Sequence, residues 1–360
     1  MDREIGIQKL IWGGLIFIVL TVGIFWYQFS KVHMGNGLPT WGQLQWDYFL
    51  LLLLFLPIDT LASGLRIWVV CRKLQPGVSL WTCLKAEWAN LGLAMLTPSQ
   101  TGGGFGQIYM LIRGGVNLGT ALTVSLITFL GSMVVLLFIG LYAFLISEAD
   151  YMGLIFQGAF LIFFLIFALL IFAVCSPGSL RSVVLWICKV FGKLCGKSMS
   201  QSNTCLQKNT CIKCLANHMN NLSEKLIDLC YLHQANMRRF FSVGKASFVW
   251  VCFLSLVFMV SRSIIAFLCL RFLGIQASSL GNVLETQLNL IFLIYFAPTP
   301  GSSGLAEGAS MLMMDNTIPS GFVPYYNLIW RCSTLYLPAI AGLLFLSWAI
   351  MQDARKALYR

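Results

Sequence analysis

The chain has 360 residues, of which 58% are hydrophobic and only 10% are charged, and its formal net charge is +11. Soluble domains carry roughly 25% charged residues, so this composition excludes a water-soluble globular protein and indicates an integral membrane protein. The positive charge does not indicate nucleic-acid binding, because most of it lies beside apolar segments, where it sets topology and contacts anionic lipid headgroups.

Six apolar runs are long enough to cross a bilayer, since about 20 mainly apolar residues span the hydrocarbon core as a helix. They are residues 10–29, 48–70, 118–146, 153–175, 247–270 and 322–350. The first run follows the acids Asp2 and Glu4 and precedes no small-residue cleavage pattern, so it is interpreted as an uncleaved anchor. We therefore predict an all-α polytopic membrane protein with six full crossings.

Loop charges predict the orientation, because lysine and arginine near helix ends stay on the cytoplasmic side. Residues 176–245 are rich in both, whereas "SEAD" at 147–150 carries only acids. Both termini and the basic linker are predicted to be cytoplasmic, in a multi-pass protein of the cell (inner or plasma) membrane. The chain then divides into a first half at 1–175, a linker at 176–245 and a second half at 246–360.

The linker carries two further patterns. Cysteines and a histidine with C-x2-C-x3-H spacing form a weak candidate zinc site, whose alternative is a cytosolic helix with reduced thiols, because structural zinc sites usually show two tight pairs: Cys205, Cys211, Cys214 and His218. Apolar residues recur at helical spacing and predict an amphipathic helix, on the membrane surface, on the bundle or against a partner: Leu215, Met219, Leu222, Leu226 and Leu229.

Two further apolar stretches, 86–116 and 283–320, are interrupted by a proline and a glycine-rich turn, "TPSQTGGG" and "TPGSSG". Such turns are tolerated at membrane depth only where they are buried in protein or line a wet cavity. The predicted topology makes the first a re-entrant hairpin from the cytoplasmic side and the second a re-entrant hairpin from the outside. Paired broken segments of opposite entry predict an inverted pseudo-repeat with a transport site at its interface.

The turns and nearby arginines indicate an anionic ligand. Backbone N–H groups of successive glycines at a helix start can bind phosphate oxygens, and this applies to residues 102–104 and 301–304. Arginine can clamp a phosphate bidentately, and charge within an apolar span marks a functional interior by default. The arginines in or beside apolar segments are Arg66, Arg113, Arg262 and Arg331, although Arg66 lies near a cytoplasmic helix end, where snorkelling is an equally weighted alternative.

Few carboxylates lie in or beside the apolar stretches, and an intramembrane acid commonly pairs with a base or relays protons. They are Glu307, Glu285 and Asp59. Glu307 is the first candidate for coupling transport to protons and Asp59 the second. An ion pair of Glu307 with Arg331 or Arg262 is the equally weighted structural alternative. Gln107 would add a hydrogen bond inside the site or join neighbouring helices.

Three segments carry a family resemblance: "TPSQTGGGFGQIYMLIRGGVNLGTA" at 97–121, "APTPGSSGLAEGAS" at 297–310 and "IWRCSTLYLPAIAG" at 329–342. With "GLRIW" at 64–68, they resemble the signatures of the lysylphosphatidylglycerol synthase transmembrane region. That family includes the flippase half of the multiple peptide resistance factor and stand-alone flippase-like proteins. On matching positions, the resemblance places the family's glycine turn at Pro300, Gly301, Gly304 and Glu307 and its arginine at Arg331, with Ser302 and Ser303 where many members have paired glycines.

The resemblance implies a flippase-like carrier that moves an anionic phospholipid or polyprenyl-phosphate-linked headgroup between leaflets, with a connection to antimicrobial peptide resistance and no cofactor. The expected substrate-binding residues are Gly102, Gly103, Gly104, Gln107, Arg113, Pro300, Gly301, Ser302, Ser303, Gly304, Arg262 and Arg331. A soluble aminoacyl-transferase domain is not expected here, so lysyltransferase activity is not expected of this chain. The alternatives are the membrane half of a phosphatidylglycerol lysyltransferase-type system, an enzyme acting on a lipid-linked substrate, and a scaffold. A separate cytosolic synthase or a second copy of the chain are the protein partners considered.

Overall fold

The computed structural model describes residues 2–31, 40–146, 151–175, 228, 231–242, 244–276, 279–295, 297–315 and 317–358. In these ranges every regular element is helical and none is a strand, which confirms the predicted all-α class. The candidate zinc residues of the linker and the apolar stripe from Leu215 to Leu229 lie outside the described residues. Within the described ranges, no group of three or more His, Cys, Asp or Glu side chains is placed to hold a metal ion.

Six helices in the described ranges are long and apolar enough to cross a membrane, as the sequence predicts. The α-helices are α1 (Asp2–Lys31), α2 (Trp46–Leu74), α3 (Leu80–Leu96), α4 (Gly103–Arg113), α5 (Leu118–Ile146), α6 (Tyr151–Cys175), α9 (Lys245–Phe272), α10 (Leu280–Ile294), α11 (Leu305–Met313), α12 (Val323–Arg331) and α13 (Leu337–Leu358). Short 3-10 turns are η1 (Trp41–Gln43), η2 (Pro98–Gln100), η3 (Pro300–Ser302) and η4 (Ser320–Phe322), and η5 (Cys332–Tyr336) is a π-helical turn.

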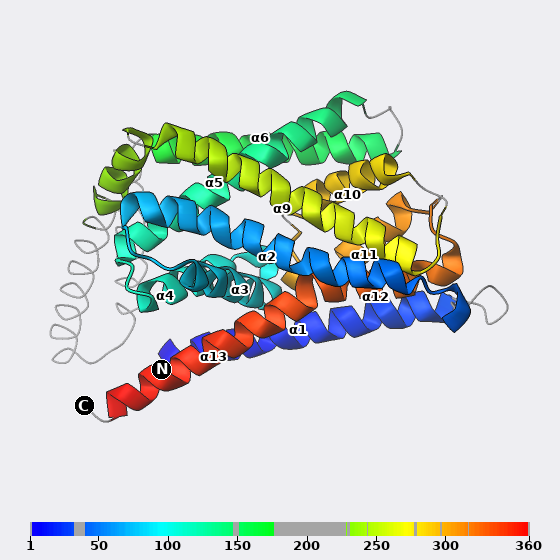
Figure 1. Cartoon of the computed structure of the whole chain (residues 1–360), viewed down its shortest axis with the longest axis horizontal. Coiled ribbons are helices and arrows are strands. Elements are labelled where there is room, and N and C mark those ends of the chain that lie inside the picture. The colour runs from blue at the N-terminus through cyan, green and yellow to red at the C-terminus, as the bar shows by residue number, and fades with distance from the viewer. Residues whose placement is uncertain are drawn as a thin grey trace, which may run out of the picture. The chain divides into compact units, whose positions relative to one another are not determined.

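The described chain forms two compact units, Met1–Phe160 with Lys245–Arg360, and Leu161–Gly244. The second unit contains the remainder of α6 and a helical stretch at residues 231–242. The first unit holds both interrupted segments, and its central pair is α2 and α9, which run antiparallel side by side (Figure 1).

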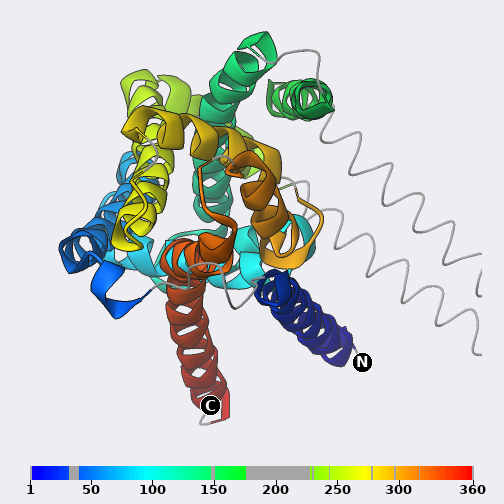
Figure 2. The same cartoon turned by 90° about the vertical axis from the view of Figure 1, so that its right-hand side faces the viewer.

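Each interrupted segment is a helical hairpin. In the first, α3 and α4 are antiparallel, since Gly114 at the end of α4 lies beside Thr82 and Gly106 lies beside Ala89. In the second, α10 is followed by α11. The two hairpins occupy opposite ends of the first unit (Figure 1), and in the end view the gold and orange second hairpin lies in front of the cyan first one (Figure 2). Their entry into a bilayer from opposite faces stays a prediction.

The turns of the two hairpins have the same construction and touch each other. "TPSQTG" at 97–102 and "TPGSSG" at 299–304 share a Thr-Pro start, a Ser or Thr at the fifth position and a final glycine. Each forms a 3-10 turn with two left-handed residues after the proline: φ is 51° and 56° at Ser99 and Gln100, and 56° at both Gly301 and Ser302. Gln100 Nε2 donates to Ser302 Oγ at 3.0 Å, which joins the two turns. This repeated conformation agrees with the predicted pseudo-repeat.

The last crossing is less regular than the sequence predicts. The apolar run at 322–350 contains α12, the π-helical turn η5 and then α13. Pro338 lacks the N–H that would bond the carbonyl of Thr334, and the N–H of Leu337 bonds the carbonyl of Cys332 five residues back. Single π-helical turns inside α-helices are frequent at functional sites. This one directly follows Arg331.

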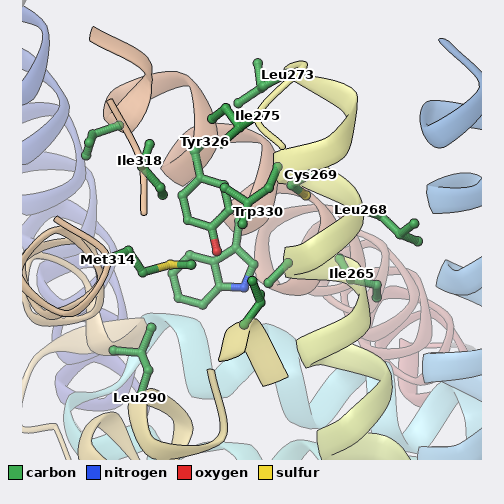
Figure 3. Packing of buried hydrophobic residues seen from close by; sticks show 14 of the residues in the cluster. Ile265, Leu268, Cys269, Leu273, Ile275, Leu290, Met314, Ile318, Tyr326 and Trp330 are labelled. Carbon is green, nitrogen blue, oxygen red and sulfur yellow. The ribbon is translucent and has the colours of Figure 1, made fainter. Parts of the chain in front are cut away.

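An apolar cluster fixes the second hairpin against α9 and α12 (Figure 3). Tyr326 and Trp330 of α12 stack with ring centroids 6.3 Å apart, and they pack with Ile265 of α9 and Met314 after α11. Tyr326 is fully buried, and its hydroxyl accepts a hydrogen bond from Gln287 Nε2 at 2.9 Å. This packing fixes the orientation of α12 and therefore the position of Arg331 at its end.

Candidate functional site

A cavity of about 160 Å³ lies where the turns of the two hairpins meet. Its walls come from α2, α3, α5, α9, the end of α10, both turns and the junction of α12 with η5. Three arginines line it: Arg66 of α2, Arg262 of α9 and Arg331 of α12. The structure therefore brings together three of the four arginines that the sequence marks, and it makes Arg66 part of the interior.

Each of these arginines lies beside a carboxylate. Arg331 Nε is 2.7 Å from Glu307 Oε1, Arg66 Nη2 is 3.5 Å from Glu87 Oε1, and Arg262 Nε is 3.5 Å from Asp59 Oδ1. Of the three acids, only Glu87 lines the cavity, whereas Glu307 and Asp59 lie behind their arginines. The three ion pairs together carry no net charge, but three guanidinium groups and only one carboxylate line the cavity itself.

The Glu307 carboxylate connects the second turn to Arg331. One carboxylate oxygen accepts the N–H of Gly304 at 2.7 Å and the other accepts Arg331 Nε, while Arg331 Nη2 donates to the carbonyl of Gly301 at 2.6 Å. Glu307 is fully buried. Of the two partners weighed for Glu307 from the sequence, the structure selects Arg331.

Most backbone N–H groups of the second turn form hydrogen bonds within the second hairpin. The N–H of Ser302 donates to the Thr299 carbonyl at 3.1 Å and the N–H of Ser303 to the Pro300 carbonyl at 3.0 Å, and Gly304 is held by Glu307. Pro300 has no N–H to offer. The N–H groups of Ser302, Ser303 and Gly304 are therefore already bonded within the second hairpin, whereas three guanidinium groups line the cavity.

The first turn opens onto a second, larger pocket of about 520 Å³. The pocket runs between α4 and α5, is lined there by Gly104 and Gln107, and shares Arg66 with the central cavity. Gly102 and Gly103 serve the hairpin itself, since the N–H of Gly102 donates to Thr97 Oγ1 at 2.8 Å and Gly103 packs against α3.

Several buried polar atoms at the central cavity have no hydrogen-bond partner among the described residues. They are Arg66 Nε, Glu87 Oε2, and Arg262 Nε and Nη2. Asp59 Oδ1 accepts from Ser261 Oγ at 3.0 Å, and its contact with Arg262 is an ion pair without hydrogen-bond alignment. Buried polar groups are nearly always hydrogen-bonded, so this group indicates a place for a polar ligand or ordered water.

Two residues marked by the sequence lie elsewhere. Arg113 is at the far end of α4, where its Nε is 3.2 Å from Asp353 Oδ1 of α13, so it does not join the other arginines. Glu285 is exposed on α10, and its Oε1 accepts from Tyr142 of α5 at 3.3 Å. The structure also adds Glu87, which the sequence analysis did not single out and whose partner Arg66 lies on another helix.

Sequence reasoning also missed the polar side chains of α1. Thr21 Oγ1 is 2.8 Å from Ser303 Oγ, and Gln28 Nε2 donates to the carbonyl of Glu307 at 3.5 Å. Gln28 is 3% exposed and its Oε1 accepts from Asn327 Nδ2 at 3.3 Å. The available signal was the spacing of Thr21 and Gln28, two polar side chains seven residues apart and therefore on one face of an apolar run.

Replacing Gln28 with leucine is expected to destabilise the protein by about 1–3 kcal/mol, because Asn327 Nδ2 loses one of its buried acceptors. The measurement is thermal unfolding of the purified protein in detergent. Ser30→Ala is the control, since the exposed Ser30 hydroxyl bonds only to the Tyr27 carbonyl of its own helix. Equal melting temperatures for both variants would contradict the expected role.

The geometry defines a polytopic all-α membrane protein in which two hairpins meet at a buried, arginine-lined cavity. Residues 11–342 match the family described as the lysylphosphatidylglycerol synthase TM region, and because this match covers most of the chain, the protein belongs to that family. No curated protein matches the chain. No solved structure matches it either.

Proposed function

We propose that this protein is a carrier that moves an anionic lipid headgroup, of a phospholipid or a polyprenyl-phosphate-linked lipid, between the leaflets of the cell membrane. In this proposal both termini are cytoplasmic, and the hairpins enter the bilayer from opposite faces. One observation carries the proposal: Arg66, Arg262 and Arg331 line a single cavity at the meeting point of the two hairpin turns. Guanidinium groups bind phosphate bidentately, and burying them in a membrane protein is costly without a functional return.

The larger pocket supports entry of the headgroup from the side. It passes between α4 and α5, where Phe129 and Ile108 line it, and reaches the central cavity at Arg66 and Gln100. A lipid can place its phosphate among the arginines while its acyl chains stay against the apolar helices. Rocking of one half against the other would then expose the site to the opposite leaflet.

Asp59 and Glu307 are the candidates for coupling this cycle to protons. Each holds an arginine from the side away from the cavity. Protonation of either carboxyl would weaken its ion pair and release the arginine toward a phosphate. The Glu307 carboxylate also accepts the N–H of Gly304 in the second turn, so Asp59 can change its charge with less disturbance to that turn.

The test is transport of fluorescently tagged lipids in liposomes that hold the purified protein, with leaflet exposure read by chemical quenching. Loss of one charge-assisted phosphate contact is expected to slow anionic lipid by roughly 10- to 100-fold in each of the paired variants Arg66→Gln/Glu87→Gln and Arg262→Gln/Asp59→Asn. Each paired variant leaves no unpaired buried carboxylate. Arg72→Gln, at the exposed end of α2, is the matched control. Wild-type rates in both cavity variants would sink the proposal.

A further inference from the structure

A second group of basic side chains lies far from the central cavity, at the end of the first unit that holds the chain termini (Figure 1). They surround a surface pocket of about 540 Å³ formed by the start of α3, the end of α4 and the end of α13. The lining residues that matter here are Lys85, Tyr109, Arg113, Trp348, Asp353 and Lys356. None of them contributes to the central cavity or to the pocket beside it.

The charges of this pocket do not cancel. Its one carboxylate, Asp353, accepts the Tyr109 hydroxyl at 2.7 Å and Arg113 Nε at 3.2 Å, so its charge is matched by Arg113. The ammonium groups of Lys85 and Lys356 remain as the excess. A pocket with two uncompensated cations selects an anion.

The aromatic side chains place this pocket at the depth of lipid headgroups. Trp348 is half exposed and lies 5.4 Å from the Arg113 guanidinium, and Trp81, also half exposed, lies 5.8 Å from Lys85 Nζ. Tryptophan concentrates at the boundary between hydrocarbon and headgroups, and lysine reaches from there toward the polar side. A pocket with apolar walls and lysine ammonium groups at the boundary between hydrocarbon and headgroups fits an amphiphile with a phosphate group and an apolar chain.

We propose that this pocket binds the phosphate group of an anionic phospholipid from the leaflet on the side of the chain termini, at a site separate from the central cavity. The Lys85 and Lys356 ammonium groups make the main contacts with the phosphate. Because α3 and α4 belong to the first half of the chain and α13 to the second, the bound lipid bridges the two halves. The proposal depends on the charges of the pocket and not on transport through the central cavity.

The experiment compares two double variants that remove equal charge from the full chain. K85Q/K356Q removes the two lysine charges of the pocket, whereas K73Q/R355Q removes two charges from exposed residues that do not line it. Native mass spectrometry in mild detergent counts the phosphatidylglycerol molecules retained by each protein during a titration. Two surface lysines are each worth about fivefold in binding, so K85Q/K356Q is expected to weaken one binding step on the order of 30-fold, with K73Q/R355Q close to wild type.

Two results would overturn the proposal. An equal loss in both double variants would mean that general surface charge holds the lipid, and no loss in either would mean that the pocket holds none. A third arm adds millimolar inorganic phosphate: displacement of the lipid from wild type would make free phosphate the ligand and overturn the lipid assignment. Loss of transport in the cavity variants Arg66→Gln/Glu87→Gln and Arg262→Gln/Asp59→Asn bears only on the carrier function, so the two proposals fail separately.

Discussion

Replacing Arg331 with methionine is expected to destabilise the protein by about 3–5 kcal/mol, because the substitution leaves the buried carboxylate of Glu307 without its ion-pair partner. The two side chains are 5% and 0% exposed and their charged atoms are 2.7 Å apart. Arg331 also holds the carbonyl of Gly301 in the second turn. The expected observations are a large fall in melting temperature in detergent and loss of lipid transport.

A double variant separates stability from function. Replacing Arg331 with methionine and Glu307 with glutamine together removes the stranded charge, and the glutamine oxygen can still accept the N–H of Gly304. Replacing both members of a buried pair is often close to neutral for stability. The double variant is therefore expected to recover most of the melting temperature, while transport stays lost because the cavity lacks one arginine. If the double variant were as unstable as Arg331→Met, the stranded carboxylate would not be the cause.

Much of the fold is predictable from the sequence because the solvent dictates it. An apolar run of about 20 residues in a chain this poor in charge must be a helix. The turns at 97–104 and 299–304 are predictable because each joins a proline to a cluster of glycines and small polar residues, whereas a single proline such as Pro57 of α2 leaves its helix continuous. That the same six-residue construction forms both turns, with left-handed backbone at Ser99 and Ser302 where no glycine requires it, emerges only from the structure.

The site is predictable in its parts and not in its pairings. A charged residue inside an apolar run is easily recognised in the sequence, so Arg262 and Arg331 can be identified as candidate site residues without a structure. Which acid each one meets depends on how helices distant in the chain pack. Glu87, 21 residues from Arg66 on the next helix, is an example that no local pattern reveals. Arg113 does not join the cavity because it lies at the other end of α4 from Gly104, which lines the neighbouring larger pocket.

The hydrogen bond between Gln100 and Ser302 connects the turns of the two hairpins, so movement of one hairpin is transmitted to the other. Both side chains line the central cavity, and Ser302 Oγ also donates to the carbonyl of Ile294 at the end of α10. The first hairpin thereby touches the helix that leads into the second. On the first hairpin's side the cavity continues into the larger pocket between α4 and α5. In a carrier with two inverted halves, this is the arrangement expected when the site faces the first hairpin's side of the membrane.

Changing Gly342 to alanine is expected to destabilise the protein by about 3 kcal/mol, because α13 crosses α3 there with no room for a side chain. A Cβ atom at position 342 would lie 1.7 Å from the carbonyl oxygen of Trp88 and 2.3 Å from its carbon. Both atoms belong to the backbone of α3, so the helices must separate. On the facing helix, a Cβ at Gly92 would lie 3.0 Å from the carbonyl of Ala339.

This crossing also controls the site, since Trp88 follows Glu87 directly and stacks on Phe345 of α13 with centroids 5.4 Å apart. Moving α13 away from α3 would move Glu87 relative to Arg66, so Gly342→Ala is expected to slow lipid transport as well as to lower the melting temperature. Gly23→Ala is the matched control, because a Cβ at that position of α1 meets nothing within 4 Å and alanine is the better helix former. The same melting temperature for Gly342→Ala and wild type would show that the two helices lie farther apart than the close crossing requires.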